Sequence, residues 1–271
     1  MRILIAGCGF VGDSLARRLV YDGHRVFGLK RNVSSLPSGV QAVPADLTDA
    51  ATLTHLPCNI DCLVFMPTPA KRDRDSYTEV FIDGWKNLWN AFGQPPGRSI
   101  VVSSTAVYGQ SDGSLVNEDS SAVPTGFNGE VLLKLEQLTT YCAENCTIIR
   151  CSGIYGPGRD RLIRQAVSAD LEIQRSPPHF SNRIHRDDVA GVLRHLLMIE
   201  TPEPLYLASD NRPTPRYEVL AWLAKQQGFA APKALVVSGA ARGKRVDNQK
   251  LRNSGYRMLY PDYRAGYRPL L

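Results

Sequence analysis

The chain has 271 residues, 43% hydrophobic and 21% charged, which is enough apolar sequence to bury a large core. Its formal charge of +6, from 32 Lys and Arg against 26 acidic residues, is dispersed along the chain. Dispersed charge suits an anionic small molecule at least as well as nucleic acid. Since no apolar run is long enough for a membrane span and the N-terminus enters a strand without a signal peptide, we expect a cytoplasmic protein whose partner is a small-molecule substrate, with neither nucleic acid nor a membrane as a partner.

A glycine-rich motif follows the first apolar segment. Residues 3–6 have the length of a buried strand, and apolar residues at helical spacing follow the glycines. In a dinucleotide clamp the first glycine permits a tight turn, the second lets the backbone approach a pyrophosphate, and the third allows close packing of helix on strand. The helix N-terminus then attracts the phosphates. A plain glycine turn is the alternative. The motif predicts an NAD(P) site with contacts from Gly7, Gly9, Phe10, Val11 and Gly12.

The end of the second predicted strand, 25–29, indicates which dinucleotide binds. Proteins that bind NAD place an acidic residue about 20 positions after the glycines, on the ribose 2′-hydroxyl. This chain has Lys30 and Arg31 there, and no carboxylate between Asp22 and Asp46. Two cations suit a 2′-phosphate, which Arg can hold with its planar fork. We therefore favour NADP over NAD; a solvent-exposed basic strand end is the alternative.

Apolar segments then alternate with helical patterns. This alternation predicts an α/β fold, a Rossmann-type doubly wound parallel sheet with a smaller C-terminal substrate lobe. We expect the NAD(P)-binding domain at 1–158, the substrate lobe at 159–271, and 184–200 packed back on the first domain. The predicted strands are 40–43, 61–66, 99–102 and 146–151, and the predicted helices are 77–92, 131–143, 187–199 and 218–227.

The cysteines do not suggest a metal site. Two pairs have a spacing of four residues, but neither has histidines at the spacing of a zinc site. We expect reduced thiols and no bound metal. The cysteines are at positions 8, 58, 62, 142, 146 and 151.

Five motifs occur in a fixed order along the chain: 7–12 (GCGFVG), 45–47 (ADL), 103–109 (SSTAVYG), 154–159 (IYGPGR) and 183–190 (RIHRDDVA). In this order they resemble the extended short-chain dehydrogenase/reductases, the NAD(P)-dependent epimerase/dehydratase family. The resemblance extends over nearly the whole chain.

The resemblance implies roles for several side chains. Asp46 would meet the adenine amino group, with Leu47 against the ring, although Asp46 is also consistent with an Asx turn. Ser104 would hydrogen-bond a substrate oxygen and is the one catalytic residue that we expect. Further cofactor contacts would come from Pro67, Thr68 and Ser103, and substrate contacts from Tyr155, Arg159, Arg183 and His185. Arg161, Arg164 and Arg175 are further candidates for holding phosphates or carboxylates, unless they form a solvated basic surface.

The chain lacks the pair of acid/base residues that is typical of the family it resembles. The family has a Tyr and, four residues later, a Lys on one helix face; the Lys lowers the Tyr pKa, and the phenol exchanges a proton with the substrate. Anchoring on Glu136-Gln137-Leu138 places Asn128 and Leu132 at these positions, and neither can do this chemistry. Glu130 and Lys134 are also four apart, but they are expected to form a solvated i,i+4 ion pair.

The sequence contains the dinucleotide clamp but lacks the family's Tyr and Lys, and this combination is consistent with two functions. We favour an NADP-dependent oxidoreductase, epimerase or dehydratase that acts on a sugar nucleotide or a related anionic small molecule, with an atypical or weakened acid/base site. The alternative is a catalytically inactive NADP(H)-binding sensor or regulatory module. The helices at 77–92 and near 131 resemble those that pair in family dimers, which suggests a homodimer.

Overall fold

The computed structural model describes residues 1–168 and 170–271, and the chain forms two compact units. Unit 1 consists of residues 1–108, 122–150 and 190–206, and unit 2 of 109–121, 151–189 and 207–271. The functional division at residue 158 and the packing of 184–200 on the first domain stay predictions.

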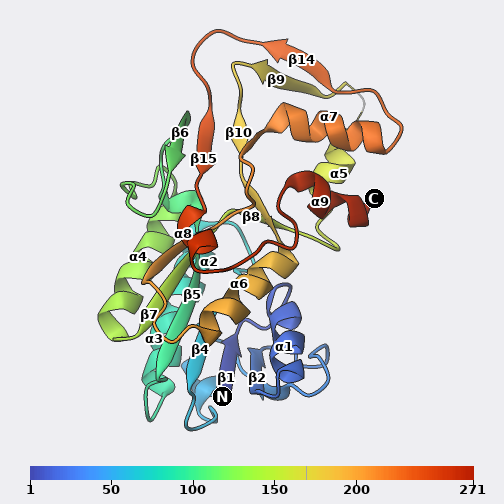
Figure 1. The fold of residues 1–271 in the computed structure, drawn as a ribbon. Helices are drawn as coiled ribbons and strands as arrows, with labels where there is room; N and C mark the ends of the chain where they lie inside the picture. The colour runs from blue at the N-terminus through green and yellow to red at the C-terminus, as the bar shows by residue number, and fades with distance from the viewer. Residues whose placement is uncertain (169) are drawn as a thin grey trace. The chain divides into compact units, whose positions relative to one another are not determined.

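A seven-stranded parallel sheet of order β12-β7-β5-β4-β1-β2-β3 confirms the predicted Rossmann-type fold (Figure 1). Residues 3–6 of β1 have no exposed surface, as expected for a parallel strand covered on both faces. The strand order reverses between β1 and β4, which is where ligands bind in such sheets. The strands are β1 (Arg2–Ala6), β2 (Arg25–Lys30), β3 (Gln41–Pro44), β4 (Cys62–Phe65), β5 (Arg98–Ser104), β7 (Cys146–Cys151) and β12 (Leu205–Ala208).

Helices cover the sheet of unit 1. Arg194 of α6 (Arg186–Met198) forms an ion pair of 2.5 Å with Asp22, the residue after α1 (Gly12–Tyr21), so these two helices are neighbours. On the other face, Trp85 of α3 (Gly84–Ala91) is fully buried and meets Phe65 of β4 edge-on at 5.1 Å. The helix α4 (Phe127–Cys142) packs beside β5 (Figure 1).

The helix predicted at 77–92 is confirmed, since the chain is helical without a break from Arg74 to Ala91. Its middle was not predicted: a π turn at Glu79–Asp83 separates α2 (Arg74–Thr78) from α3. The apolar spacing continues through the π turn, where Phe81 and Ile82 are buried, so the sequence pattern did not reveal it. The helix predicted at 131–143 begins earlier, at Phe127, directly after its N-cap residue Gly126.

Unit 2 consists of short elements around one helix. Its apolar cluster joins Val219, Leu220 and Leu223 of α7 with the aromatic rings of Tyr155 and Tyr263. Unit 2 also contains four two-stranded sheets: β6–β15, β8–β11 and β9–β14, which are parallel, and β10–β13, which is antiparallel. The elements are β6 (Asp112–Val116), β8 (Gly153–Tyr155), α5 (Arg161–Ala166), β9 (Glu172–Ser176), β10 (Phe180–Ser181), β11 (Arg183–His185), β13 (Thr214–Pro215), α7 (Arg216–Gln226), β14 (Lys233–Val236), β15 (Gly243–Val246), α8 (Gln249–Asn253) and α9 (Tyr263–Tyr267).

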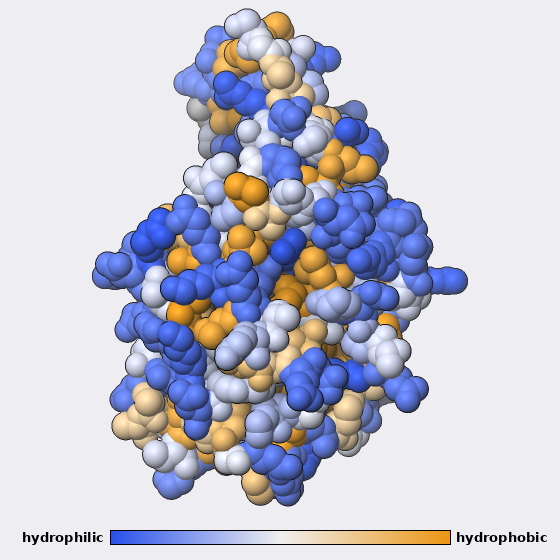
Figure 2. Space-filling view, turned by 90° about the vertical axis from the view of Figure 1, so that its left-hand side faces the viewer, coloured by the Kyte–Doolittle hydropathy of each residue, from blue (hydrophilic) through white to orange (hydrophobic). Residues whose placement is uncertain are grey.

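Hydrophilic residues cover most of the face shown in Figure 2, with hydrophobic residues scattered among them. Single exposed apolar side chains such as Tyr21 and Tyr141 are ordinary for a protein surface. Within the described part of the chain, no helix combines the length and the apolar character that crossing a membrane requires.

Candidate functional site

Gly7 makes the turn that closes the predicted clamp. Its φ is +94°, and a Cβ atom there would lie 2.6 Å from the Cα and N atoms of Pro67, so only glycine fits. The Gly7 amide donates to the Leu29 carbonyl at 3.0 Å, which ties the turn to β2. Pro67, predicted as a cofactor contact, therefore lies directly against the clamp, followed by the exposed Thr68.

Gly9 and Gly12 are required for different reasons. A Cβ atom at Gly12 would lie 3.0 Å from the Gly7 carbonyl oxygen, so this glycine allows α1 to pack closely on the turn. A Cβ atom at Gly9 would have no heavy atom within 4 Å, so packing within the protein does not demand this glycine. In a dinucleotide clamp, the second glycine is the one that lets the backbone approach a pyrophosphate. Val11, at the N-cap of α1, has no side-chain capping bond, so no side chain caps the positive end of the helix dipole, which attracts anions.

The cations at the end of β2 lie as the sequence predicts. Lys30 Nζ donates to Ser35 Oγ at 3.0 Å. Arg31 is 69% exposed in its side chain, and its Nη1 atom is 3.7 Å from Asp46 Oδ2. An ion pair this long and this exposed is weak, and the Arg31 guanidinium can therefore turn toward a phosphate.

Asp46 adopts the Asx turn that we named as an alternative. Its Oδ1 atom accepts hydrogen bonds from the Thr48 amide at 3.0 Å and from the Thr48 hydroxyl at 2.8 Å. This turn fixes the carboxylate and does not by itself exclude a role at the adenine. Leu47 is only 6% exposed and packs against Gly84 of α3, so most of its side chain belongs to the core.

Ser104 ends β5 and begins a 3₁₀ turn at Thr105–Val107. Its Oγ accepts a hydrogen bond from the Ala106 amide at 3.1 Å, which fixes the oxygen and leaves the hydroxyl hydrogen to donate. The first turn of α4 presses on this turn: a Cβ atom at Gly129 would lie 2.2 Å from the Ala106 carbonyl oxygen. The beginning of α4, which includes Asn128, therefore lies against the segment that carries Ser104.

A buried polar network behind Ser104 was not predicted. Glu136 of α4 accepts the Ser103 hydroxyl at 2.5 Å and two nitrogens of Arg150, Nε at 3.0 Å and Nη2 at 2.7 Å. Arg150 Nη1 donates to the Tyr108 hydroxyl at 2.7 Å. Burial alone would lower the pKa of Arg150, but the bond to Glu136 and its charge raise that pKa above the ordinary value. The sequence did contain one sign of this network: an arginine, Arg150, inside the otherwise apolar strand predicted at 146–151 must find a buried partner.

Ser103 and Tyr108 thus each have a hydrogen-bond partner inside the protein, and the cofactor contact expected of Ser103 stays a prediction. The Arg150 charge is already neutralised by Glu136, so it does not supply Tyr108 with a free cation of the kind that Lys gives Tyr in the family pair. Tyr108 is 1% exposed, and Ser103 is 4% exposed.

The predicted Glu130–Lys134 ion pair is wrong. Glu130 instead forms an ion pair of 2.7 Å with Arg74 of α2, since α2 packs on α4 and brings the guanidinium within reach. Leu132 is buried at 5% exposure. None of the 11 Tyr residues of the chain has a Lys four positions later, so the sequence contains no Tyr-x-x-x-Lys motif.

Three of the four predicted substrate residues come together in unit 2. His185 of β11 pairs in register with Tyr155 of β8, and Arg183 is two residues before His185 on the same strand face. All three are at most 5% exposed. The ring of Tyr155 stacks on that of Tyr267, with the ring centroids 4.2 Å apart. This environment is closer to a core than to an open pocket.

Polar atoms in this cluster lack hydrogen-bond partners among the described residues: Tyr155 Oη, Arg183 Nη1, His185 Nε2 and Asp210 Oδ2. His185 Nδ1 accepts from the Asp187 amide at 3.1 Å, so the neutral ring carries its proton on Nε2. Burial lowers the pKa of His185, which favours that neutral form. The fourth predicted residue, Arg159, is in the loop before α5, where its amide donates to the Gly156 carbonyl at 2.9 Å and burial lowers its pKa.

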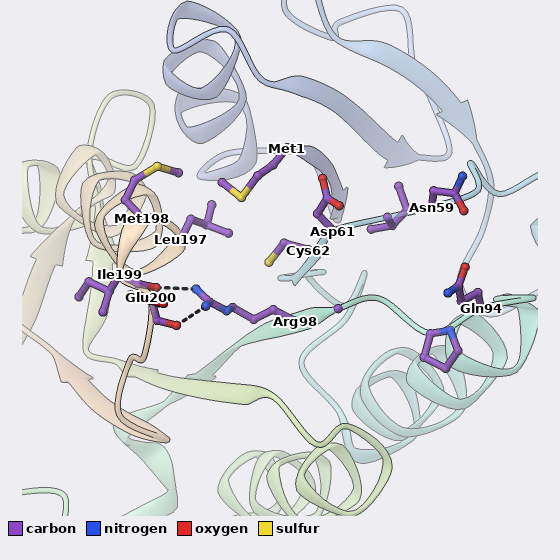
Figure 3. Close-up of a pocket in the computed structure, with 13 residues that line it drawn as sticks. Met1, Asn59, Asp61, Cys62, Gln94, Arg98, Leu197, Met198, Ile199 and Glu200 are labelled. Atoms are coloured by element: carbon purple, nitrogen blue, oxygen red, sulfur yellow. Dashed lines mark hydrogen bonds between the residues drawn. The ribbon is translucent and has the colours of Figure 1, made fainter.

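A pocket of about 560 Å³ is lined by Asp61 and Cys62, where β4 begins, and by Arg98, where β5 begins (Figure 3). It therefore lies at the opposite ends of the strands from the clamp. Arg98 lines it, and its guanidinium donates to the carbonyls of Ile199 at 2.7 Å and Glu200 at 2.6 Å. Because ligands of such sheets bind at the carboxyl ends of strands, this pocket is not the predicted cofactor site.

Comparison with known proteins identifies the family. The model of the NAD dependent epimerase/dehydratase family matches residues 3–193. The chain belongs to this family. A protein from Methylobacillus flagellatus assigned to the NAD-dependent epimerases/dehydratases has 39% identity and a TM-score of 0.85, over 99% of this chain and 97% of that one. Protein YeeZ of Escherichia coli K12 is 27% identical over 96% of this chain and 97% of its own. The fold is also that of MoeE5 in complex with UDP-glucose and NAD, at 23% identity and a TM-score of 0.79, over 98% and 96% of the two chains.

Proposed function

We propose that this epimerase/dehydratase-family chain binds NADP(H) through unit 1 and acts as an oxidoreductase, epimerase or dehydratase on a sugar nucleotide or a related anionic small molecule. The observation that carries the proposal is the open space at Gly9, beside two glycines that packing does require. At this position of a dinucleotide clamp, a pyrophosphate would approach the backbone, and the open space at Gly9 leaves room for it.

The cofactor would be held by three groups of residues. The Gly7–Gly12 turn and the N-terminus of α1 would take the pyrophosphate, and Lys30 and Arg31 the 2′-phosphate. Asp46 would lie near the adenine, and Pro67 and Thr68 near the ribose. When bound, the nicotinamide supplies a hydride acceptor or donor.

Ser104 would hold the reacting oxygen of the substrate. Its own oxygen is fixed by the Ala106 amide, so its hydroxyl hydrogen can point at a carbonyl or hydroxyl of the substrate. Asn128, on the turn of α4 pressed against this segment, can donate and accept hydrogen bonds but cannot carry a proton from one group to another. We therefore infer that proton transfer is atypical or weakened. Loss of a positioned acid/base group slows a reaction by roughly 10²–10⁴-fold.

The test combines binding and turnover. NADPH and NADH are titrated by nicotinamide fluorescence, and sugar nucleotides are then screened for a change in nicotinamide absorbance. We expect tighter binding of NADPH, and turnover that Ser104→Ala abolishes. Glu130→Gln and Lys134→Met are the matched controls on α4 and should leave turnover unchanged. A preference for NADH that Arg31→Ala does not alter would contradict the choice of NADP.

The absence of any Tyr-x-x-x-Lys motif favours a second candidate, a catalytically inactive NADP(H)-binding sensor or regulatory module. Tight NADPH binding without turnover on any substrate of the panel would support it over the enzyme. A homodimer and a cytoplasmic location remain predictions; light scattering of the purified protein tests the former.

A further inference from the structure

One buried ion pair of unit 1 is bonded to both ends of the segment that carries Ser104. The segment runs from Ser103, near the end of β5, through the 3₁₀ turn to Tyr108. At one end the Ser103 hydroxyl donates to Glu136 Oε1 at 2.5 Å. At the other end the Tyr108 hydroxyl accepts from Arg150 Nη1 at 2.7 Å. Since Arg150 and Glu136 also bind each other, both ends of the segment are tied to one group, which we call the anchor pair.

The anchor pair lies behind the segment, and Ser104 faces away from it. Successive side chains along a strand point to opposite faces. Ser103, which the anchor pair binds, is 4% exposed, whereas the next residue, Ser104, is partly exposed. Ser104 Oγ accepts instead from the Ala106 amide, inside the same segment. The anchor pair can therefore act on the Ser104 hydroxyl only by fixing the backbone of the segment.

The geometry of the anchor pair restricts the position of the segment. Arg150 directs Nε and Nη2 at the carboxylate of Glu136 and Nη1 at the Tyr108 hydroxyl, all from one planar group. Its guanidinium carbon also lies 4.9 Å from the centre of the Tyr108 ring. Buried ion pairs are weak evidence for stability, because well-packed apolar side chains often stabilise a fold as much. A planar fork that holds a carboxylate and a phenol at once supplies a direction, which an apolar side chain cannot do.

We propose that Arg150 and Glu136 are positioning residues, which place the Ser104 hydroxyl for the reaction without touching the substrate. This inference rests on the proposed function, because it takes Ser104 to hold the reacting oxygen. Displacement of a reacting group by roughly 1 Å can slow a reaction about 100-fold. Release of the segment from the anchor pair should therefore lower kcat. KM and NADPH affinity should stay the same, since both side chains of the anchor pair are buried away from any ligand.

The experiment uses the full chain and two variants. Tyr108→Phe removes the hydroxyl that Arg150 binds and keeps the ring and the ion pair. Arg150→Lys keeps the charge but loses the planar fork, so it cannot hold both partners in the same directions. In each variant, NMR measures hydrogen exchange at the Ala106 amide, which should become about 10-fold faster once the segment is released. With a substrate found by the sugar-nucleotide screen, kcat should fall about 10-fold or more at unchanged KM and NADPH affinity.

Thr139→Val is the matched control for Tyr108→Phe. It removes another buried hydroxyl of unit 1, but this one donates to the Leu135 carbonyl at 2.9 Å within α4. Ala106 exchange and kcat should stay at their wild-type values in this control. Unchanged Ala106 exchange in both variants, or an unchanged kcat in both, would overturn the proposal. Failure of the proposed function is separable: it would show as a wild type without NADPH binding or turnover, while Ala106 exchange still reports whether the anchor pair holds the segment.

Discussion

Arg150 holds both carboxylate oxygens of Glu136 in the interior of unit 1, with Nε 3.0 Å from Oε1 and Nη2 2.7 Å from Oε2. Both side chains are less than 10% exposed. The pair joins α4 to β7, and through Ser103 it reaches the end of β5 where Ser104 lies. The polar network therefore connects the three elements around the proposed substrate oxygen.

Breaking this pair from one side should be costly. Glu136→Gln leaves the Arg150 cation buried without its counter-charge, and we expect a loss of about 3–5 kcal/mol in the free energy of unfolding. Urea unfolding followed by circular dichroism measures it. The control is Glu130→Gln, which removes one partner of the exposed pair with Arg74 and should cost less than about 1 kcal/mol. Equal losses of unfolding free energy in the two variants would show that the buried pair contributes no more to stability than the exposed one.

Gly129 sets the distance between α4 and the turn that follows Ser104. Gly129→Ala places a Cβ atom 2.2 Å from the Ala106 carbonyl oxygen, which backbone cannot accommodate without moving. We expect a loss of about 1–3 kcal/mol in stability, together with lost turnover if Ser104 acts as proposed. Gly93→Ala is the control, since its Cβ atom would meet nothing within 4 Å. A Gly129→Ala protein as stable as the Gly93→Ala protein would contradict this packing.

The thiols should differ strongly in reactivity. Burial raises the pKa of four of them to about 12, so little thiolate forms at neutral pH: Cys8, Cys62, Cys146 and Cys151. Cys58 is exposed and Cys142 is partly exposed. We expect an aromatic disulfide reagent at pH 8 to react rapidly with these two thiols only, so that the double variant Cys58→Ser/Cys142→Ser loses the fast reaction. A fast phase that persists in the double variant would mean that one of the four thiols with a raised pKa is accessible.

Asp210 should make stability depend on pH in an unusual direction. Burial raises the pKa of Asp210 to about 7, although the positive charge of Arg183 opposes part of this rise. In the unfolded chain an aspartate has a pKa of about 4. Between these values the folded state binds more protons than the unfolded state, so stability falls as the pH rises from about 4 to 7. Urea unfolding across this range should show the fall in the wild type relative to Asp210→Asn. Parallel pH curves for the two proteins would contradict the raised pKa.

The sequence predicted those parts of the molecule that depend on local chemistry. The glycine motif and the apolar strand before it predicted the strand–turn–helix at the N-terminus, where packing requires Gly7 and Gly12. The alternation of strands and helices predicted the parallel sheet. The cations at Lys30 and Arg31 lie at the tip of β2, as their position after an apolar strand indicates.

Features that depend on contacts distant in sequence were not predicted. The partner of Glu130 is Arg74, 56 residues away, and only the packing of α2 on α4 makes that pair. The link between Glu136 and Arg150 likewise requires α4 to lie on β7. The π turn at Glu79–Asp83 is hidden because the apolar spacing continues through it.

The most direct test of the account is the NADPH affinity of the wild type against Gly9→Ala. The added methyl group meets no protein atom within 4 Å, so the variant should fold with unchanged stability. If the space holds a pyrophosphate, NADPH binding should weaken at least about 10-fold, since the methyl group keeps the phosphates from the backbone. A wild type that binds neither NADPH nor NADH at millimolar concentration, or a Gly9→Ala protein that binds NADPH as well as the wild type, would contradict the proposed cofactor site.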